Sequence, residues 1–122
     1  MITKEDRIFI TGGSGFIGTN LIDLFVKKSY NFINLDKAEP IKKDQINYWI
    51  KGNIVNMADL ESVFSKYHPT VVIHLAARTD TLSTDIKDYL ENTQGSKNII
   101  DIVKKYSCVR HLIMTSDRKS VV

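Results

Sequence analysis

A glycine-rich segment near the start of the chain places the strictest condition on its fold. The segment Thr11-Gly12-Gly13-Ser14-Gly15-Phe16-Ile17-Gly18 follows a short apolar run and precedes an amphipathic one. A tight strand-to-helix turn needs a residue that tolerates positive φ, which is the role expected of Gly12. Gly15 lacks the Cβ that would keep a pyrophosphate away from the backbone, and Gly18 lets the helix lie close to the sheet. The free N–H groups at the start of that helix favour a negatively charged ligand.

Short runs rich in β-branched residues recur along the chain. They are almost continuously apolar, as strands covered on both faces are. The expected strands span residues 7–11, 32–35, 48–50, 71–75 and 111–114.

Helical patterns fill most of the space between these runs. In the first, Ile17, Leu21 and Phe25 recur every four residues. The second begins after Asn56, whose side chain suits an N-cap. The third is a long helix, for which the expected apolar face is Ile86, Leu90, Thr93, Lys97, Ile100 and Val103.

The order of these segments predicts an α/β fold with a doubly wound, Rossmann-type parallel sheet of about five strands. Residues 37–47 contain Pro40 and many polar side chains, and we expect an irregular connection there. Of the 122 residues, 43% are apolar and 25% are charged, which suits one domain with one core.

Composition and charge exclude several function classes. No stretch approaches the roughly 20 apolar residues of a membrane helix, and the first six residues lack the apolar core of a signal peptide. The net charge of +3 is scattered, unlike the basic stripe of a nucleic-acid-binding protein. The single cysteine, Cys108, suits the reducing cytoplasm. No metal site is expected, because His68, His74 and His111 match no ligand spacing.

Asp36 ends the second expected strand, 18 residues after Gly18. In a dinucleotide-binding unit, a carboxylate at this place accepts hydrogen bonds from the ribose hydroxyls of adenosine. It also repels a 2′-phosphate, so the sequence favours NAD over NADP. Lys37 keeps NADP as an alternative. The other interpretation of Asp36 is an ordinary surface residue at a strand end.

Motifs along essentially the whole chain resemble those of the extended short-chain dehydrogenase/reductase family, especially the nucleotide-sugar epimerases and dehydratases. Besides the glycine turn, the motifs are Asn34-Leu35-Asp36, Gly52-Asn53-Ile54, His74-Leu75-Ala76-Ala77, Asn92-Thr93-Gln94-Gly95 and Met114-Thr115-Ser116-Asp117. The residues that this resemblance assigns to an NAD site are Gly12, Gly15, Phe16, Ile17, Gly18, Asp36, Lys37, Asn53, Ile54, Leu75, Ala76, Ala77, Arg78 and Asn92.

The resemblance also assigns roles within that site. The backbone of Phe16-Ile17 would lie against the pyrophosphate. Asn53 replaces an acid that holds the adenine amino group, and its amide oxygen can accept the same bond more weakly. Arg78 would begin the loop on the nicotinamide side, and Asn92 would brace the long helix against the floor of the active site.

For catalysis, the resemblance implies Ser116 as the hydroxyl that binds the sugar oxygen and Asp117 as the acid of the dehydratase branch. The family's general base, a Tyr four residues before a Lys, is missing. The residues four places after the five tyrosines are Asn34, Gly52, Val71, Thr93 and Arg110. The later strands and the substrate lobe are missing too. We therefore expect residues 1–122 to form one NAD(P)-binding domain, truncated after the fifth strand.

Three hypotheses remain open from the sequence. The chain is a family member that keeps the NAD site without turnover, or it is active when another segment or chain supplies Tyr and Lys. The third hypothesis is a non-catalytic module that binds a dinucleotide or associates with itself. An unpaired edge after the fifth strand predicts a homodimer.

Overall fold

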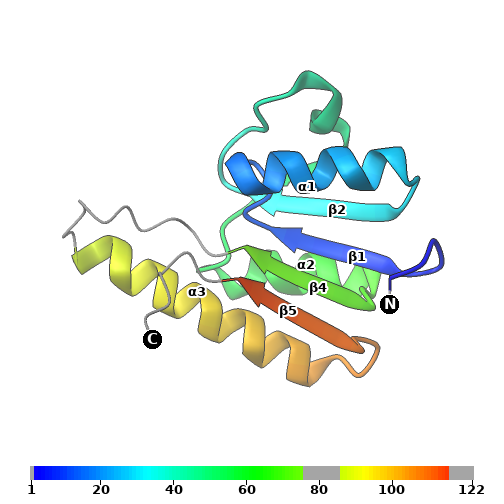
Figure 1. Ribbon diagram of the computed structural model, residues 1–122. Coiled ribbons are helices and arrows are strands. Elements are labelled where there is room, and N and C mark those ends of the chain that lie inside the picture. The colour runs from blue at the N-terminus through cyan, green and yellow to red at the C-terminus, as the bar shows by residue number, and fades with distance from the viewer. Residues whose placement is uncertain (1, 76–85, 116–122) are drawn as a thin grey trace, which may run out of the picture.

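Five parallel strands form a single sheet in the computed structural model, which describes residues 2–75 and 86–115, without the side chains of 86–93 and Thr115. The strands lie in the order β3-β2-β1-β4-β5 (Figure 1). Their bounds are β1 (Arg7–Thr11), β2 (Asn31–Asp36), β3 (Trp49–Lys51), β4 (Val71–Leu75) and β5 (His111–Thr115). The doubly wound parallel sheet that the sequence predicts is confirmed.

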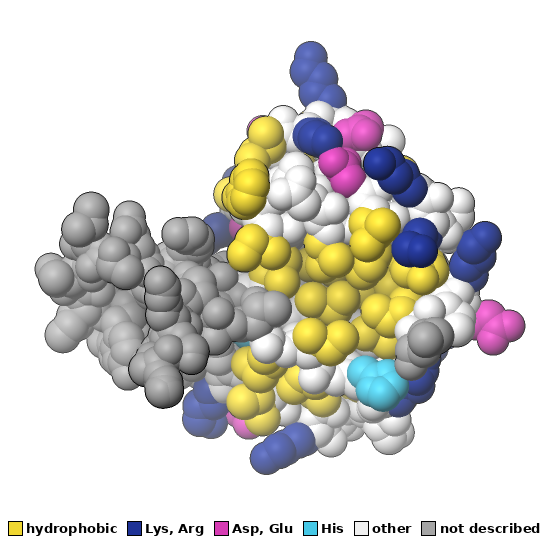
Figure 2. Space-filling model, viewed as in Figure 1, with side chains coloured by type: hydrophobic (Ala, Val, Ile, Leu, Met, Phe, Trp, Pro, Cys, Tyr) yellow, Lys and Arg dark blue, Asp and Glu magenta, His cyan; other side chains and the backbone are white. Residues whose placement is uncertain are grey.

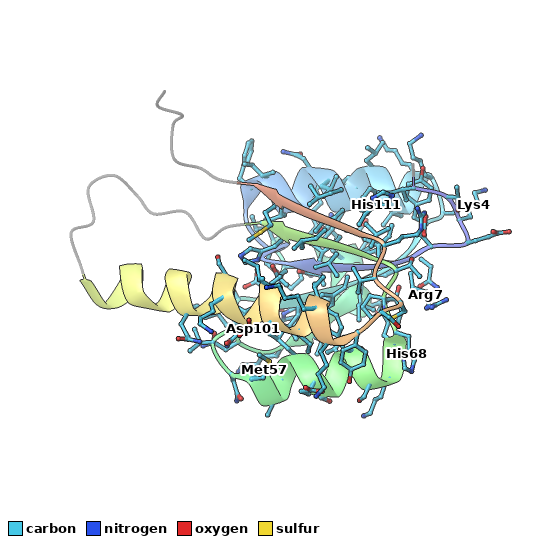
Figure 3. The ribbon with its side chains drawn as sticks, turned by 90° about the horizontal axis from the view of Figure 1, so that it is seen from below. Lys4, Arg7, Met57, His68, Asp101 and His111 are labelled. Carbon is cyan, nitrogen blue, oxygen red and sulfur yellow. The ribbon has the colours of Figure 1, made fainter. Side chains whose placement is uncertain are left out.

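Three helices cover the two faces of this sheet. They are α1 (Phe16–Lys27), α2 (Met57–Tyr67) and α3 (Ile86–Lys105). Figure 3 shows α1 on one side of the sheet and α2 and α3 on the other. None of the helices in the described ranges has both the length and the apolar character needed to cross a membrane.

The two faces of the sheet have separate cores. Ile22 and Phe25 of α1 pack with Ile8 and Ile10 of β1 on one face. On the other face, a second cluster is formed by Phe9, Leu35, Leu60, Val63, Phe64, Val72, Ile99 and Ile102. β1 is buried on both faces, which explains why Ile8, Phe9 and Ile10 follow one another without a polar residue between them.

The expected apolar face of α3 is wrong in part, since only Val103 among the described side chains of that face packs against the second cluster. Lys97 and Ile100 are exposed, whereas Ile99 and Ile102 are buried against the sheet. The buried side of the helix also carries Asn98, which is 5% exposed. A polar residue on the sheet-facing side hides the helical period, so the spacing of apolar residues alone selects a neighbouring stripe.

The connection before β3 is also more regular than expected. Residues Lys43–Tyr48 form a 3-10 helix, η1. Gln45, 1% exposed, fastens this turn to α1 because its Nε2 donates to Thr19 O over 3.0 Å and to Asp23 Oδ1 over 2.9 Å. The Tyr48 ring stacks on Phe32, with 4.4 Å between centroids. Tertiary contacts of this kind leave no periodic signal in a six-residue segment.

Candidate functional site

A hollow that is open to solvent lies at the carboxyl ends of β1, β2 and β4. The chain leaves β1 toward β2 on one side and reaches β4 on the other, so the strand order reverses at β1. Ligands of open α/β sheets bind at such a switch point. The lining residues are Thr11, Gly12, Leu35, Asp36, Lys37, Gly52, Asn53, Ile54, Val55 and Leu75. Gly12, Asp36, Lys37, Asn53, Ile54 and Leu75 are among the residues that the sequence predicts for the site.

Gly12 begins the turn that joins β1 to α1. Its φ is +74°, and an added Cβ would lie 2.5 Å from the carbonyl oxygen of Leu75. Any side chain here would therefore meet both backbone strain and a clash with β4. The positive φ predicted for Gly12 is confirmed.

The other two predicted glycines differ in what surrounds them. An added Cβ at Gly18 would overlap the backbone of Gly13, so the close packing of α1 on the turn requires glycine there. At Gly15, the nearest atom to an added Cβ is Gly12 O at 3.9 Å, and φ is an ordinary −81°. The fold does not require glycine at position 15, which leaves its bare backbone open to a ligand.

The N-terminus of α1 carries positive partial charge without a neutralising side chain. The N-cap residue Gly15 makes no side-chain cap, and the first turn holds no acidic residue. Phe16 and Ile17 are 79% and 58% exposed. By contrast, α2 is capped by Asn56, whose Oδ1 accepts from Ala58 N over 3.0 Å, as the sequence predicts. The α1 terminus therefore suits an anion.

Asp36 forms the rim of the hollow on the β2 side. Its Oδ2 accepts a hydrogen bond from Ser14 N over 2.9 Å, and its Oδ1 accepts one from Ala38 N over 3.0 Å. The carboxylate is thus fixed in place by the glycine turn and by the chain that follows β2. Each carboxylate oxygen keeps further lone-pair capacity, so Asp36 can still accept from ribose hydroxyls.

The loop after β3 also lines the hollow, beside Asp36. Asn53 Oδ1 accepts from Val55 N over 3.0 Å, and Asn53 N donates to Asp59 Oδ2 over 2.9 Å. Asn98 of α3 supports the loop from behind by donating to Ile54 O and Val55 O, both over 2.9 Å. The amide oxygen expected to meet adenine therefore already serves one internal bond.

His74 connects β1 with α3 beneath the hollow. Its Nδ1 lies 2.6 Å from Thr11 Oγ1, and its Nε2 lies 3.0 Å from Ser96 Oγ. The ring is 2% exposed, and burial lowers the pKa of His74 below its usual value. A neutral imidazole donates from one nitrogen and accepts at the other, which matches two hydroxyl partners.

Sequence reasoning gave no role to two buried polar residues that shape the site, Asn34 and Asn98, although Asn34 begins the motif Asn34-Leu35-Asp36. Each interrupts an apolar pattern, and such an interruption is the one signal that could have identified them. Other predicted residues lie outside the described part of the chain: Ala76, Ala77, Arg78, Ser116, Asp117 and the side chain of Asn92. Within the described ranges, no group of three or more His, Cys, Asp or Glu side chains could hold a metal ion.

Comparisons with known proteins agree with this arrangement. Residues 8–118 match the NAD dependent epimerase/dehydratase family. A dTDP-D-glucose 4,6-dehydratase of Dictyostelium discoideum is 32% identical over 135 residues, which cover 96% of this chain and 31% of the relative. This chain thus spans about a third of the length of the curated relatives it matches.

Solved structures show the same fold. The UDP-glucose 4-epimerase of Thermotoga maritima, solved with UDP-glucose, superposes with a TM-score of 0.78 at 28% identity, covering 90% of this chain and 37% of that one. The Bordetella bronchiseptica enzyme WbmG, in complex with NAD, has a TM-score of 0.73 at 29% identity, covering 89% and 36%.

Proposed function

The chain belongs to the NAD dependent epimerase/dehydratase family, and from this premise we propose that residues 1–122 form one NAD-binding domain. NAD would lie across the carboxyl ends of β1, β2 and β4. The observation that carries this proposal is the uncapped N-terminus of α1, with the open backbone of Gly15, beside a hollow bordered by Asp36. The related Bordetella bronchiseptica enzyme WbmG, solved in complex with NAD, supports it.

Each part of the dinucleotide has a matching partner in this chain. The diphosphate would accept from the first N–H groups of α1, at Gly15, Phe16 and Ile17. Asp36 would accept from the adenosine ribose, and Asn53 and Ile54 would border the adenine. The negative charge of Asp36 disfavours the 2′-phosphate of NADP. When bound, NAD supplies a hydride acceptor for the oxidation of a sugar hydroxyl.

We further propose that a nucleotide-sugar is the substrate of the complete enzyme and that this chain alone does not turn it over. Ser116 and Asp117 would supply the hydroxyl and the acid. The sequence contains no Tyr four residues before a Lys, so the proton acceptor must come from another segment or chain. A non-catalytic dinucleotide-binding module is the alternative. The single cysteine supports a reducing compartment such as the cytoplasm.

Self-association through the β5 side is a further part of the proposal. Figure 2 views the face that carries α1 and shows hydrophobic side chains gathered over its middle. Leu24 and Ile113, which belong to α1 and β5, are 45% and 43% exposed. Among the described strands β5 pairs only with β4, so its outer edge can pair with a second copy. Sedimentation at high concentration should show a dimer, and a clean monomer would contradict this part.

Calorimetric titration with NAD⁺ and then NADP⁺ tests the cofactor. We expect saturable binding that prefers NAD⁺, and Asp36→Asn should narrow the preference because it removes the charge that repels the 2′-phosphate. An unchanged ratio of the two affinities would show that Asp36 does not face the ribose. Absence of binding up to millimolar NAD⁺ would refute the proposal for this chain. Turnover of a sugar nucleotide by the chain alone would refute the missing-base argument.

A further inference from the structure

Asn34 is a polar residue at the centre of an apolar sheet. It lies on β2 next to β1, and its side chain is 0% exposed. Both polar atoms of its amide nevertheless have a partner. Oδ1 accepts from Gly13 N over 2.8 Å, and Nδ2 donates to Ser14 Oγ over 3.3 Å. Both partners belong to the glycine turn, so the buried amide of Asn34 holds that turn and no other described segment.

The bond to Gly13 is the middle one of three consecutive bonds between the turn and β2. Gly12 N donates to Leu35 O over 3.1 Å, Gly13 N to Asn34 Oδ1, and Ser14 N to Asp36 Oδ2. These three N–H groups are therefore turned toward the protein. The N–H groups that follow, from Gly15 to Ile17, precede the first helical bond, which Thr19 N donates to Gly15 O.

Gly13 and Asn34 also fit each other sterically. An added Cβ at Gly13 would lie 2.5 Å from Asn34 Oδ1 and 2.7 Å from Asn34 Cγ. Gly13 has no positive φ, so its backbone conformation does not require glycine. The close approach of the Asn34 amide does. This explains a glycine for which turn geometry alone gives no reason.

We propose that Asn34 is the positioning residue of the diphosphate site: its amide draws Gly13 and Ser14 onto β2, so that the next N–H groups stay directed at the ligand. The proposal rests on the proposed function as far as the ligand is concerned. Asp36 contacts both the turn and the expected ribose position, whereas the two bonds of Asn34 go to the turn. Loss of Asn34 should therefore weaken recognition of the diphosphate and spare that of adenosine.

Chemical-shift titrations of the full 122-residue chain with ADP-ribose and with adenosine test this separation. For Asn34→Val we expect the dissociation constant for ADP-ribose to rise about tenfold, as for a lost hydrogen-bonding position, and that for adenosine to change less than about twofold. Thr70→Val is the matched control, because the Thr70 hydroxyl bonds Arg7 N and Asp6 Oδ1 at the other end of the sheet. It should leave both constants unchanged. Equal losses for the two ligands, or none, would overturn the proposal.

Amide hydrogen exchange in the ligand-free protein separates this inference from the proposed function. If Asn34 holds the turn, Gly13 N–H is protected in the wild type, and its exchange rises at least about tenfold in Asn34→Val while the β1 amides keep their protection. Fast exchange of Gly13 in the wild type refutes the inference whether or not NAD binds, and needs no variant to fold. Protection of Gly13 in a chain that binds no ADP-ribose would refute only the proposed function.

Discussion

The two ends of the sheet treat polar groups in opposite ways. At the amino ends of the strands, Asp6 is 4% exposed and accepts from Arg110 Nη2 at both oxygens, each over 2.7 Å. Thr70 Oγ1 and Thr3 N donate to the same carboxylate, each over 2.9 Å. Arg7, at this end in Figure 3, donates from Nε to Tyr67 O and His68 O. Donors and acceptors meet their partners within the protein.

At the carboxyl ends, the glycine turn directs three N–H groups inward and leaves the α1 terminus uncapped. No acidic residue in the first turn of α1 offsets the positive partial charge. The difference indicates a division of tasks along one set of strands. The amino end supplies stability, and the carboxyl end keeps unpaired polar capacity for a ligand. Loss of a polar contact at the amino end should therefore leave ligand affinity unchanged, and a change at the open backbone of Gly15 should leave stability unchanged.

Gly18→Ala should have the largest effect. The new Cβ would overlap the Gly13 backbone, so α1 must move away from the turn. We expect a loss of about 2–4 kcal/mol in the free energy of unfolding together with the loss of NAD binding, by analogy with overpacked cores. Urea denaturation and calorimetry measure the two effects.

Gly15→Ala is the matched control for that variant. Its Cβ meets no atom closer than 3.9 Å, so the unfolding free energy should stay within about 0.5 kcal/mol of the wild type. NAD affinity should nevertheless fall, because the methyl group occupies the approach to the backbone. If Gly15→Ala binds NAD as tightly as the wild type, the diphosphate does not lie against the Gly15 backbone. The carboxyl ends of the strands would then lose their assignment as the ligand-binding end.

Asp6→Asn tests the amino end. The amide cannot replace the charge-assisted bonds to Arg110, and we expect the unfolding free energy to drop by about 2 kcal/mol. NAD affinity, extrapolated to the fully folded protein, should not change. A parallel loss of affinity would show that the two ends are coupled through β1.

The sequence predicts these two ends unequally well. The turn was predictable because Gly12 and Gly18 meet local requirements of backbone and packing, and because Gly15 lies between them at the spacing of a dinucleotide-binding turn. The doubly wound parallel sheet followed from the alternation of strand-like and helix-like segments and from the rules for parallel crossovers. Asp6 and Arg110 gave no signal, since 104 positions separate them and their pairing exists only once β1 and β5 lie in the same sheet.

The roles of the polar residues that brace the site were not predicted either. Asn34 in β2 and Asn98 in α3 interrupt apolar patterns, and each has a backbone partner far along the chain, Gly13 N for Asn34 and Ile54 O for Asn98. The spacing of apolar side chains assigns every polar residue to the solvent-facing side, so it misplaces a buried amide. The face of α3 was mispredicted for that reason. A polar residue in an expected core position can therefore indicate a nearby turn or loop that its side chain holds, as Asn34 and Asn98 do here.

The pH dependence of unfolding measures how much the charge of Asp6 contributes to stability. The Arg110 guanidinium and the other donors hold the pKa of Asp6 well below its usual range. A lowered folded pKa gives stability that is present above the unfolded value of 3.8 and is lost as pH falls below it. The difference in unfolding free energy between wild type and Asp6→Asn should thus be full at pH 6 and shrink below about pH 4. A difference independent of pH would mean that packing, not charge, sets the effect.

The smallest effect concerns His74, the buried titratable group at the carboxyl end. Burial lowers the pKa of His74 below 6.5. Near pH 6 the imidazole of the unfolded chain therefore takes up a proton more readily than the buried imidazole of the folded protein does. Stability is then present above pH 6.5 and declines as pH falls toward 5, a window above that of Asp6. His74→Asn should flatten this slope, and His111→Asn, which changes an exposed ring at the start of β5, should keep it. If the slope survives in His74→Asn, the Thr11–His74–Ser96 chain does not require a neutral ring, and the carboxyl end tolerates internal charge as the amino end does.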